Sequence, residues 1–244
     1  RTGGEANAVA VRIARAASGR DNVAICGYHG WHDWYLAANI KSNKNLNEHL
    51  ISGLSPYGVP KALKNTVFPF SYNNFAELKN LVSANKDIGV IKIEVARNFR
   101  PQNNFLQKIR KLCDKNKIVL IFDECTSGFR ETYGGLHKKY NVEPDMAIFG
   151  KALGNGYAIT SILGKRKVME TAQNSFISST FWTERIGPTA ALATLKVMKK
   201  EESWKIITNI GKKVKVGWKK LANKHKLMIN ISGPNYIQTI SIYP

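Results

Sequence analysis

A regular alternation of short apolar segments with helical segments predicts an α/β protein, in which a mostly parallel sheet carries helices on both faces. Residues 88–95 and 118–122 are continuous apolar segments, which is typical of strands that are buried on both sides of a sheet. Helical segments of about 10–15 residues separate the strands, and this length suits the crossover connections between parallel strands.

Each element follows from its own local pattern. A first helix is expected over residues 5–17, because Val9, Ile13 and Ala17 recur at helical spacing. Apolar runs predict strands at residues 22–26, 67–70, 88–95, 118–122, 146–149 and 159–163. Helical spacing predicts further helices at residues 73–85, 105–115, 184–199 and 203–224. Residues 31–39 suit a helix or a turn, and the Gly- and Pro-punctuated residues 41–64 suit a loop.

The composition is that of a globular protein. Of the 244 residues, 43% are hydrophobic and 22% are charged, which excludes disorder, collagen and a coiled coil as the main architecture. No apolar run approaches the ~18 residues that a membrane helix needs. Cys26, Cys113 and Cys125 lack the spacing of metal ligands, so we expect no metal site, and free thiols in a reducing, cytoplasmic compartment. Both ends of the chain look cut, so we expect a piece of a longer protein.

The net charge of +20 raises the possibility of a nucleic-acid partner. Lysine, however, makes up 27 of the 37 basic residues, whereas base recognition favours arginine. The lysines are densest in residues 196–226, where we expect apolar residues to face the core and the lysines to face solvent. The apolar set is Leu195, Val197, Ile206, Ile207, Ile210, Val214, Val216, Trp218 and Leu221. A specific nucleic-acid site is therefore not expected, although a basic nucleic-acid-binding protein stays the distant alternative.

Two polar side chains follow apolar strands at the place where functional groups collect in a parallel sheet. Residues 118–122 run directly into Asp123, and residues 146–149 are followed by Gly150 and Lys151. A desolvated lysine becomes a nucleophile for carbonyl groups, and a buried aspartate needs a cation or a hydrogen-bond donor. The pair suggests a Schiff-base lysine and a carboxylate that binds a cation. A helix cap for Asp123 and a chance position for Lys151 are the alternatives.

Two further segments could hold a flat, phosphorylated ligand. Gly3 and Gly4 open the first helix, where free backbone N–H groups favour an anion, with a plain helix start before the acidic Glu5 as the alternative. Tyr28 follows the strand of residues 22–26 and could stack on a ring, with packing as the alternative. A carbonyl group for Lys151, a basic ring nitrogen for Asp123, a phosphate and a flat ring together describe pyridoxal 5′-phosphate.

The order TGGEA, GYHG, IVLIFDECTSGFR, FGKALGNG and STF resembles the class III aminotransferases, in particular the branch of glutamate-1-semialdehyde aminomutase. The resemblance implies the large domain of a fold type I pyridoxal-phosphate enzyme in residues 1–230, incomplete at its N-terminus. Residues 231–244 would begin a truncated C-terminal small domain. The resemblance also implies that Lys151 forms the Schiff base and moves the proton, and that Asp123 keeps the ring nitrogen protonated.

The same resemblance assigns further cofactor contacts. The implied cofactor-binding residues are Gly3, Gly4, Tyr28, His29, Glu94, Asp123, Cys125, Lys151 and Thr180. Gly3 and Gly4 would bind the phosphate, although the family usually carries a hydroxyl residue at the position of Gly4. Tyr28 would stack on the ring and Cys125 would pack on its other face. Thr180 would reach the phosphate of a neighbouring subunit, which implies a homodimer.

The implied activity is an amino transfer between a small-molecule amino donor and an oxo acceptor. Glutamate-1-semialdehyde 2,1-aminomutase, which transfers the amino group within one molecule, is the alternative. The expected protein is a class III transaminase that requires pyridoxal phosphate, with no metal and no membrane partner.

Overall fold

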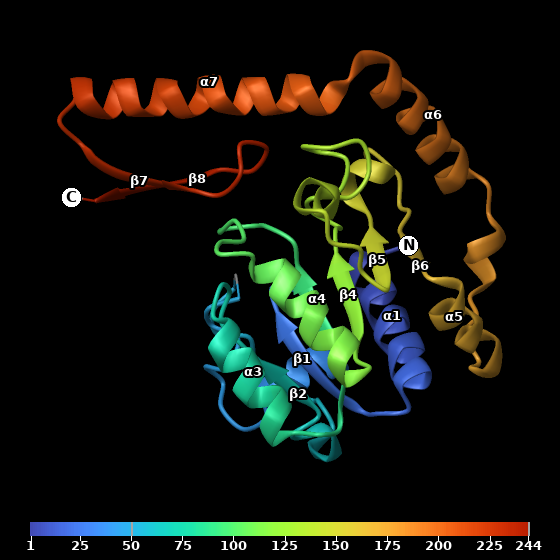
Figure 1. The fold of residues 1–244 in the computed structure, drawn as a ribbon. Helices are drawn as coiled ribbons and strands as arrows, with labels where there is room; N and C mark the ends of the chain where they lie inside the picture. The colour runs from blue at the N-terminus through green and yellow to red at the C-terminus, as the bar shows by residue number, and fades with distance from the viewer. Residues whose placement is uncertain (50, 244) are drawn as a thin grey trace.

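A mostly parallel sheet forms the centre of the protein. The computed structural model describes residues 1–49 and 51–243, which form a six-stranded sheet in the order β2-β1-β3-β4-β5-β6 and a separate two-stranded sheet (Figure 1). The six strands are β1 (Asn22–Cys26), β2 (Val67–Pro69), β3 (Ile88–Glu94), β4 (Val119–Asp123), β5 (Met146–Phe149) and β6 (Ser161–Gly164). Strands β1 to β5 pair in parallel, and β6 pairs antiparallel with β5 at the edge. The predicted sheet type is therefore confirmed.

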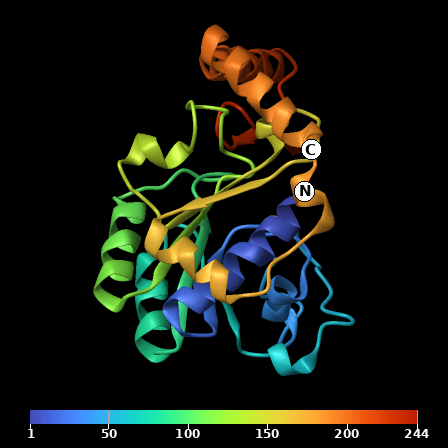
Figure 2. The same ribbon diagram turned by 90° about the vertical axis from the view of Figure 1, so that its right-hand side faces the viewer.

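Helices cover both faces of this sheet, as predicted. Helix α1 (Gly3–Ser18) and the short α5 (Arg166–Met169) lie on one face, and α3 (Phe75–Ala84) and α4 (Phe105–Asn116) lie on the other (Figures 1 and 2). In β1, Val23 and Ile25 belong to the core beneath α1, whereas Ala24 and Cys26 belong to the core beneath α3 and α4. Successive strand residues point to opposite faces, so β1, β3, β4 and β5 are mostly apolar because both of their faces are covered.

The structure also contains short elements that have no strong sequence pattern. Residues 31–39 form α2 (Asp33–Leu36) and η1 (Ala37–Asn39), and the described part of the 41–64 loop contains η2 (Lys61–Leu63). The elements that the sequence did not indicate are α5, η3 (Leu136–Tyr140), η4 (Lys151–Leu153), η5 (Glu170–Asn174), η6 (Thr180–Thr183), β7 (Met228–Ser232) and β8 (Thr239–Tyr243). The short helical elements span too few turns to display a helical period.

The two C-terminal helices, α6 (Ile186–Glu201) and α7 (Ser203–Lys224), form as predicted, with α6 two residues later in the chain than expected, but they do not pack as predicted. Helix α7 extends past the main body of the fold (Figure 1). Ile206, Ile210 and Leu221 are 49%, 55% and 57% exposed, and Val197, Val214 and Val216 are also exposed. The prediction that these residues face the core is therefore wrong within this chain. The physical reason is that the main contacts of α7 are with α6 and β7, which leaves much of its apolar surface without a partner.

The β7–β8 hairpin returns toward the sheet. The Gly233 N–H donates to the carbonyl of Asn98 at 3.2 Å, and the Tyr236 hydroxyl donates to the carbonyl of Ala96 at 3.4 Å. The hairpin begins at Met228, close to the expected boundary after residue 230, and the division into two domains there stays a prediction.

Three further observations concern the described residues as a whole. None of the helices in residues 1–49 and 51–243 combines the length and the apolar character that crossing a bilayer requires. The same residues bring no three His, Cys, Asp or Glu side chains together as metal ligands. Cys26, Cys113 and Cys125 are all buried and form no disulfide.

Candidate active site

The candidate site lies at the carboxyl ends of the parallel strands. Glu94 ends β3 and Asp123 ends β4, and these two residues are direct Cα partners in the ladder. Lys151 follows the neighbouring strand β5 after one intervening residue. Tyr28 and His29 follow β1, which pairs with β3 on its other side. The strand order thus brings five of the candidate residues to adjacent strand ends.

Asp123 is buried and has several polar partners. Its Oδ2 lies 2.9 Å from Nδ1 of His29, and its Oδ1 accepts a hydrogen bond from the Cys125 N–H at 3.1 Å. Burial alone would raise the pKa of this carboxyl, but the charge of Lys92 and the contact with His29 outweigh burial and hold the pKa well below its ordinary value. A 3% exposed carboxylate therefore stays charged near neutral pH.

Lys92 is a site residue that the sequence analysis missed. It is fully buried, its Nζ lies 3.9 Å from Oδ2 of Asp123, and this Nζ has no hydrogen-bond partner among the described residues. Burial lowers the pKa of Lys92, although the charge of Asp123 opposes this shift. A signal was present, because a lysine interrupts the run IGVIKIEV, which was treated as continuously apolar.

His29, Tyr28 and Glu94 form the side of the site next to β1. Burial lowers the pKa of His29 to about 4, and Lys92 acts in the same direction, so the imidazole is neutral near pH 7. Glu94 accepts a hydrogen bond from the Tyr28 N–H at 3.0 Å and one from Arg97 at 2.9 Å. Burial raises the pKa of Glu94 to about 7 against the opposing charge of Arg97. Glu94 thus fixes the backbone that carries Tyr28.

Tyr28 itself is partly buried and packs against two neighbours. Its ring meets Tyr35 edge-on with 6.0 Å between the ring centres, and the Arg97 guanidinium lies 5.9 Å from its centre. These two contacts fix the position of the Tyr28 ring beside the strand ends.

Lys151 has an uncommon backbone conformation. Its φ is +42°, in the left-handed region that side chains other than glycine seldom adopt. The Nζ donates a hydrogen bond to Oγ1 of Thr126 at 2.7 Å, which holds the amine near the segment that follows Asp123. Desolvation lowers the pKa of Lys151, with the charge of Arg97 acting in the same direction. A lowered amine pKa increases the nucleophilic fraction of a lysine at neutral pH.

The N-terminus of α1 approaches the same place. A β-carbon added at Gly3 would lie 3.7 Å from Sγ of Cys125, and one added at Gly150 would lie 3.4 Å from this sulfur. Thr2 caps the helix by accepting a hydrogen bond from the Glu5 N–H at 3.2 Å. The N–H groups of Gly3 and Gly4 begin the first turn, where no intrahelical acceptor exists. They are therefore available to an anion.

Gly4 lies where the helix and the β1 loop come very close. Gly30 has a φ of +102°, and a β-carbon added at Gly30 would lie 2.9 Å from Cα of Gly4. A β-carbon at Gly4 would lie 3.1 Å from the His32 ring. The small residue at position 4 is thus explained by this close approach.

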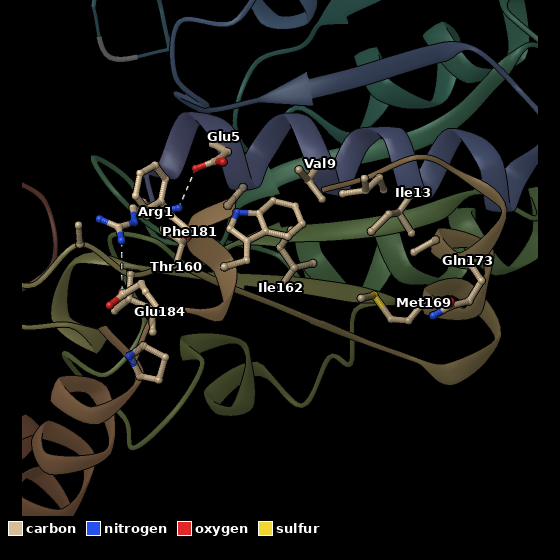
Figure 3. A pocket seen from close by; sticks show the side chains of 17 residues that line it. Arg1, Glu5, Val9, Ile13, Thr160, Ile162, Met169, Gln173, Phe181 and Glu184 are labelled. Carbon is tan, nitrogen blue, oxygen red and sulfur yellow. Dashed lines mark hydrogen bonds and ion pairs between the residues drawn. The ribbon is translucent and has the colours of Figure 1, made fainter. Parts of the chain in front are cut away.

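Thr180 is not joined to these residues by any hydrogen bond in the described part of the chain. It is exposed at the start of η6, close to a cavity of about 500 Å³ that η6 shares with α1 and β6 (Figure 3). The Arg1 guanidinium lies 4.7 Å from the Phe181 ring centre, and it pairs with Glu184 at 3.6 Å. Neither Lys151 nor Asp123 lines this cavity. A role for Thr180 toward a neighbouring subunit stays a prediction.

Asp123 and Glu124 are adjacent in the sequence, but their side chains have different roles. It is fully buried and accepts hydrogen bonds from the backbone N–H groups of Leu136 and His137, each at 3.0 Å. Its Oε1 also lies 2.8 Å from Nδ1 of His137. Glu124 thus anchors the segment around residue 136, whereas Asp123 faces the site.

The site therefore combines three chemical capacities at one edge of the sheet. Lys151 offers an amine for a carbonyl group, Asp123 offers a buried negative charge for a cation, and the start of α1 offers N–H groups for an anion. Cys125 links these parts, because its N–H binds Asp123 and its sulfur faces Gly3. Thr180 makes no hydrogen bond to any of these residues in the described part of the chain.

Comparison with known proteins agrees with this arrangement. Residues 1–240 match the family described as Aminotransferase class-III. The chain is 32% identical, over 99% of its length, to 3-aminobutyryl-CoA aminotransferase of Cloacimonas acidaminovorans (strain Evry), and it covers 56% of that protein. It is 36% identical, over 82% of its length, to glutamate-1-semialdehyde 2,1-aminomutase of Nitrosopumilus maritimus (strain SCM1), and it covers 48% of that protein. The chain thus spans about half the length of these relatives.

Solved structures support the same fold. The FumI protein of Sphingopyxis sp. MTA144, in its PLP internal aldimine form, superposes with a TM-score of 0.88 at 23% identity, covering 100% of this chain and 57% of that one. An omega-transaminase from Sphaerobacter thermophilus superposes with a TM-score of 0.85 at 23% identity, covering 99% of this chain and 58% of that one. These structures share the fold, and the family match over residues 1–240 shows that the chain belongs to the class III aminotransferase family.

Proposed function

We propose that the protein is a pyridoxal-phosphate-dependent aminotransferase, which moves an amino group between a small-molecule amino donor and an oxo acceptor. The observation that carries this proposal is the position of a buried, charged Asp123 and of the Lys151 amine at neighbouring strand ends, where Nζ of Lys151 binds Thr126 in the segment that follows Asp123. Membership of the class III family supports it.

The residues present fit pyridoxal phosphate. Asp123 supplies the negative charge that a protonated ring nitrogen needs, and Lys151 supplies the amine that a Schiff base needs. The first N–H groups of α1 supply donors for the phosphate, and Tyr28 supplies a flat surface beside the strand ends. When bound, the cofactor provides a carbonyl group for the amine and an electron sink for the bonds that change.

Residues of the chain itself move the proton and position the reacting groups. Nζ of Lys151 is the atom that holds and moves a proton, and the desolvation that lowers its pKa makes it able to do both near neutral pH. Thr126 accepts a hydrogen bond from this Nζ and so limits where the amine can move. The contact with His29 and the Cys125 N–H orient the two oxygens of Asp123.

An intramolecular amino transfer by an aminomutase uses the same residues, and relatives of that name are among the similar proteins. We keep this as the alternative within the same family. We further propose that two copies form a homodimer in which Thr180 reaches the neighbouring site, that residues 1–230 form the cofactor domain, and that the protein is cytoplasmic.

The test compares two lysine variants of the full-length protein. Lys151→Ala is expected to lose both the visible absorbance of the bound cofactor and amino transfer from a panel of amino acids and ω-amino acids. Lys165→Ala is the matched control, because Lys165 pairs with Asp145 at 2.7 Å, far from the strand ends that carry the site. Transfer at the wild-type rate by Lys151→Ala would refute the assignment.

A further inference from the structure

Lys92 has a position that the proposed function does not use. It lies on β3, where the alternation of side chains puts it with Val90 on the face that α1 covers. The side chain is fully buried, and among the described residues no carboxylate oxygen approaches its Nζ more closely than Oδ2 of Asp123, at 3.9 Å. A charged lysine is very seldom fully buried unless it is paired, so the charge of Lys92 depends on Asp123.

The other charged groups near this pair already have partners of their own. Glu94, on the same strand, binds Arg97, and Lys151, after β5, binds Thr126. His29, after β1, is neutral near pH 7 because burial lowers its pKa to about 4. Burial also raises the pKa of Cys125 far above neutral, so this thiol carries no charge.

Helix α1 adds no charge that could replace Lys92. Glu5 pairs with the amino group of Arg1 at 2.7 Å, Arg12 donates to the carbonyl of Phe176, and Arg15 donates to the carbonyl of Asp21. Its buried polar residue Asn7 is uncharged. Among the described residues, only His29 and Lys92 have a nitrogen within 4 Å of Asp123 in an ion-pair geometry. Because His29 is neutral, Lys92 is the one cation there.

A protonated ring nitrogen bound to Asp123 would be a second cation at a single buried carboxylate. Two cations that share one anion in a buried site repel each other, and the cation that is held less well becomes neutral. Nζ of Lys92 lies 3.9 Å from Oδ2 of Asp123 and has no hydrogen-bond partner among the described residues, so its charge is held poorly. We propose that Lys92 is a positioning residue that serves as the internal counter-ion of Asp123, and that it releases its proton when the protonated ring nitrogen of the cofactor binds.

This inference rests on the proposed function. The proton balance is simple: one proton leaves Nζ of Lys92 for solvent, and the net charge at Asp123 is the same before and after binding. Burial, which lowers the pKa of Lys92, makes this release easier. The linkage predicts that acid weakens cofactor binding through Lys92, in addition to any effect through Lys151.

The experiment titrates the full-length apoprotein with pyridoxamine 5′-phosphate, which binds without a Schiff base. Calorimetry in buffers of different ionisation enthalpy gives the number of protons released. Wild type is expected to release about one proton more than Lys92→Met, and its affinity should rise about tenfold more per pH unit. Lys92→Met should bind more tightly than wild type at low pH, because the ring nitrogen no longer displaces a cation.

Control variants and a cofactor analogue distinguish proton release by Lys92 from a purely structural role of this lysine. Lys165→Met, which removes the lysine of a remote Lys–Asp pair, should release as many protons as wild type. A 1-deaza cofactor analogue, which lacks the ring nitrogen, should abolish the difference between wild type and Lys92→Met. Lys92→Gln provides the same comparison if Lys92→Met does not fold.

Equal proton release by wild type and both Lys92 variants would overturn the inference. Weaker binding by the variants at every pH would also overturn it, because that result indicates a structural lysine. Failure of the wild type to bind pyridoxamine 5′-phosphate at all would refute the proposed function as well, so the two failures are distinguishable.

Discussion

Replacing Asp123 by asparagine removes one charge while it preserves most of the shape of the site. The side-chain carbonyl of the introduced asparagine can still accept the hydrogen bond that the Cys125 N–H makes at 3.1 Å. The amide N–H₂ of the asparagine can donate to Nδ1 of His29 if the imidazole carries its proton on Nε2. This tautomer costs no hydrogen bond, because Nε2 is buried without a partner among the described residues. We therefore expect Asp123→Asn to retain the local geometry and to lose the negative charge.

The magnitude follows from the burial of this carboxylate. Opposite unit charges about 3 Å apart attract by about 5.5 kcal/mol at an effective dielectric constant of about 20. A neutral hydrogen bond from the asparagine returns about 1–1.5 kcal/mol. The remaining loss of about 4 kcal/mol corresponds to a rate decrease on the order of 10³-fold if it falls on the transition state.

The assay follows a single half-reaction of the full-length holoenzyme with its fastest amino donor. Asp123→Asn also leaves Lys92 opposite an uncharged amide, and breaking a buried pair costs about 3–5 kcal/mol of folding free energy. Thermal unfolding is therefore recorded in parallel. The double variant Asp123→Asn/Lys92→Met restores charge balance, and it should recover stability but not rate. Near-normal turnover by a folded Asp123→Asn would show that Asp123 only caps the strand.

Three further outcomes are expected. Burial raises the pKa of Glu94 in the folded protein to about 7, against an ordinary 4.5, so its contribution to folding is present in full below about pH 4.5 and is lost as the pH rises toward 7. In urea titrations, the free energy of unfolding should therefore fall over this pH range for wild type and stay flat by comparison for Glu94→Gln. Parallel curves for the two proteins would contradict a buried carboxyl at this position. Mixing Lys151→Ala subunits with Thr180→Ala subunits should raise activity above that of either parent, because one site of the hybrid dimer keeps both residues; if subunits exchange without recovery, Thr180 does not act across an interface. The excess positive charge, mostly lysine, should bind random and selected nucleic acids weakly and lose them as salt rises, and sub-micromolar, sequence-selective binding at physiological salt would contradict this.

Much of the fold was predictable, because strands and helices are local patterns. The apolar runs at residues 22–26 and 146–149 match β1 and β5 in full, and the helix expected at residues 203–224 matches α7. Asp123 and Lys151 were also identifiable, because each comes at or just after the end of an apolar run, and the ends of parallel strands lie at one edge. Such features depend on the order of residues along a single segment.

The pairing of Lys92 with Asp123 was not predictable in this way. It depends on the register between β3 and β4, where Glu94 lies opposite Asp123 and Lys92 reaches the carboxylate from two residues earlier. The approach of Gly3 to Cys125 similarly depends on how α1 crosses the sheet. Contacts between segments far apart in the chain leave no trace in the local pattern of either segment.

Helix α7 also shows that a local pattern does not determine tertiary contacts. The period of Ile206, Ile210 and Val214 determined that the helix has an apolar side, and the structure has that helix. Whether a core covers that side was decided only by the tertiary structure, which leaves these residues exposed within the chain. A helical period records where apolar side chains point relative to one another, and burial depends on which other segment reaches them.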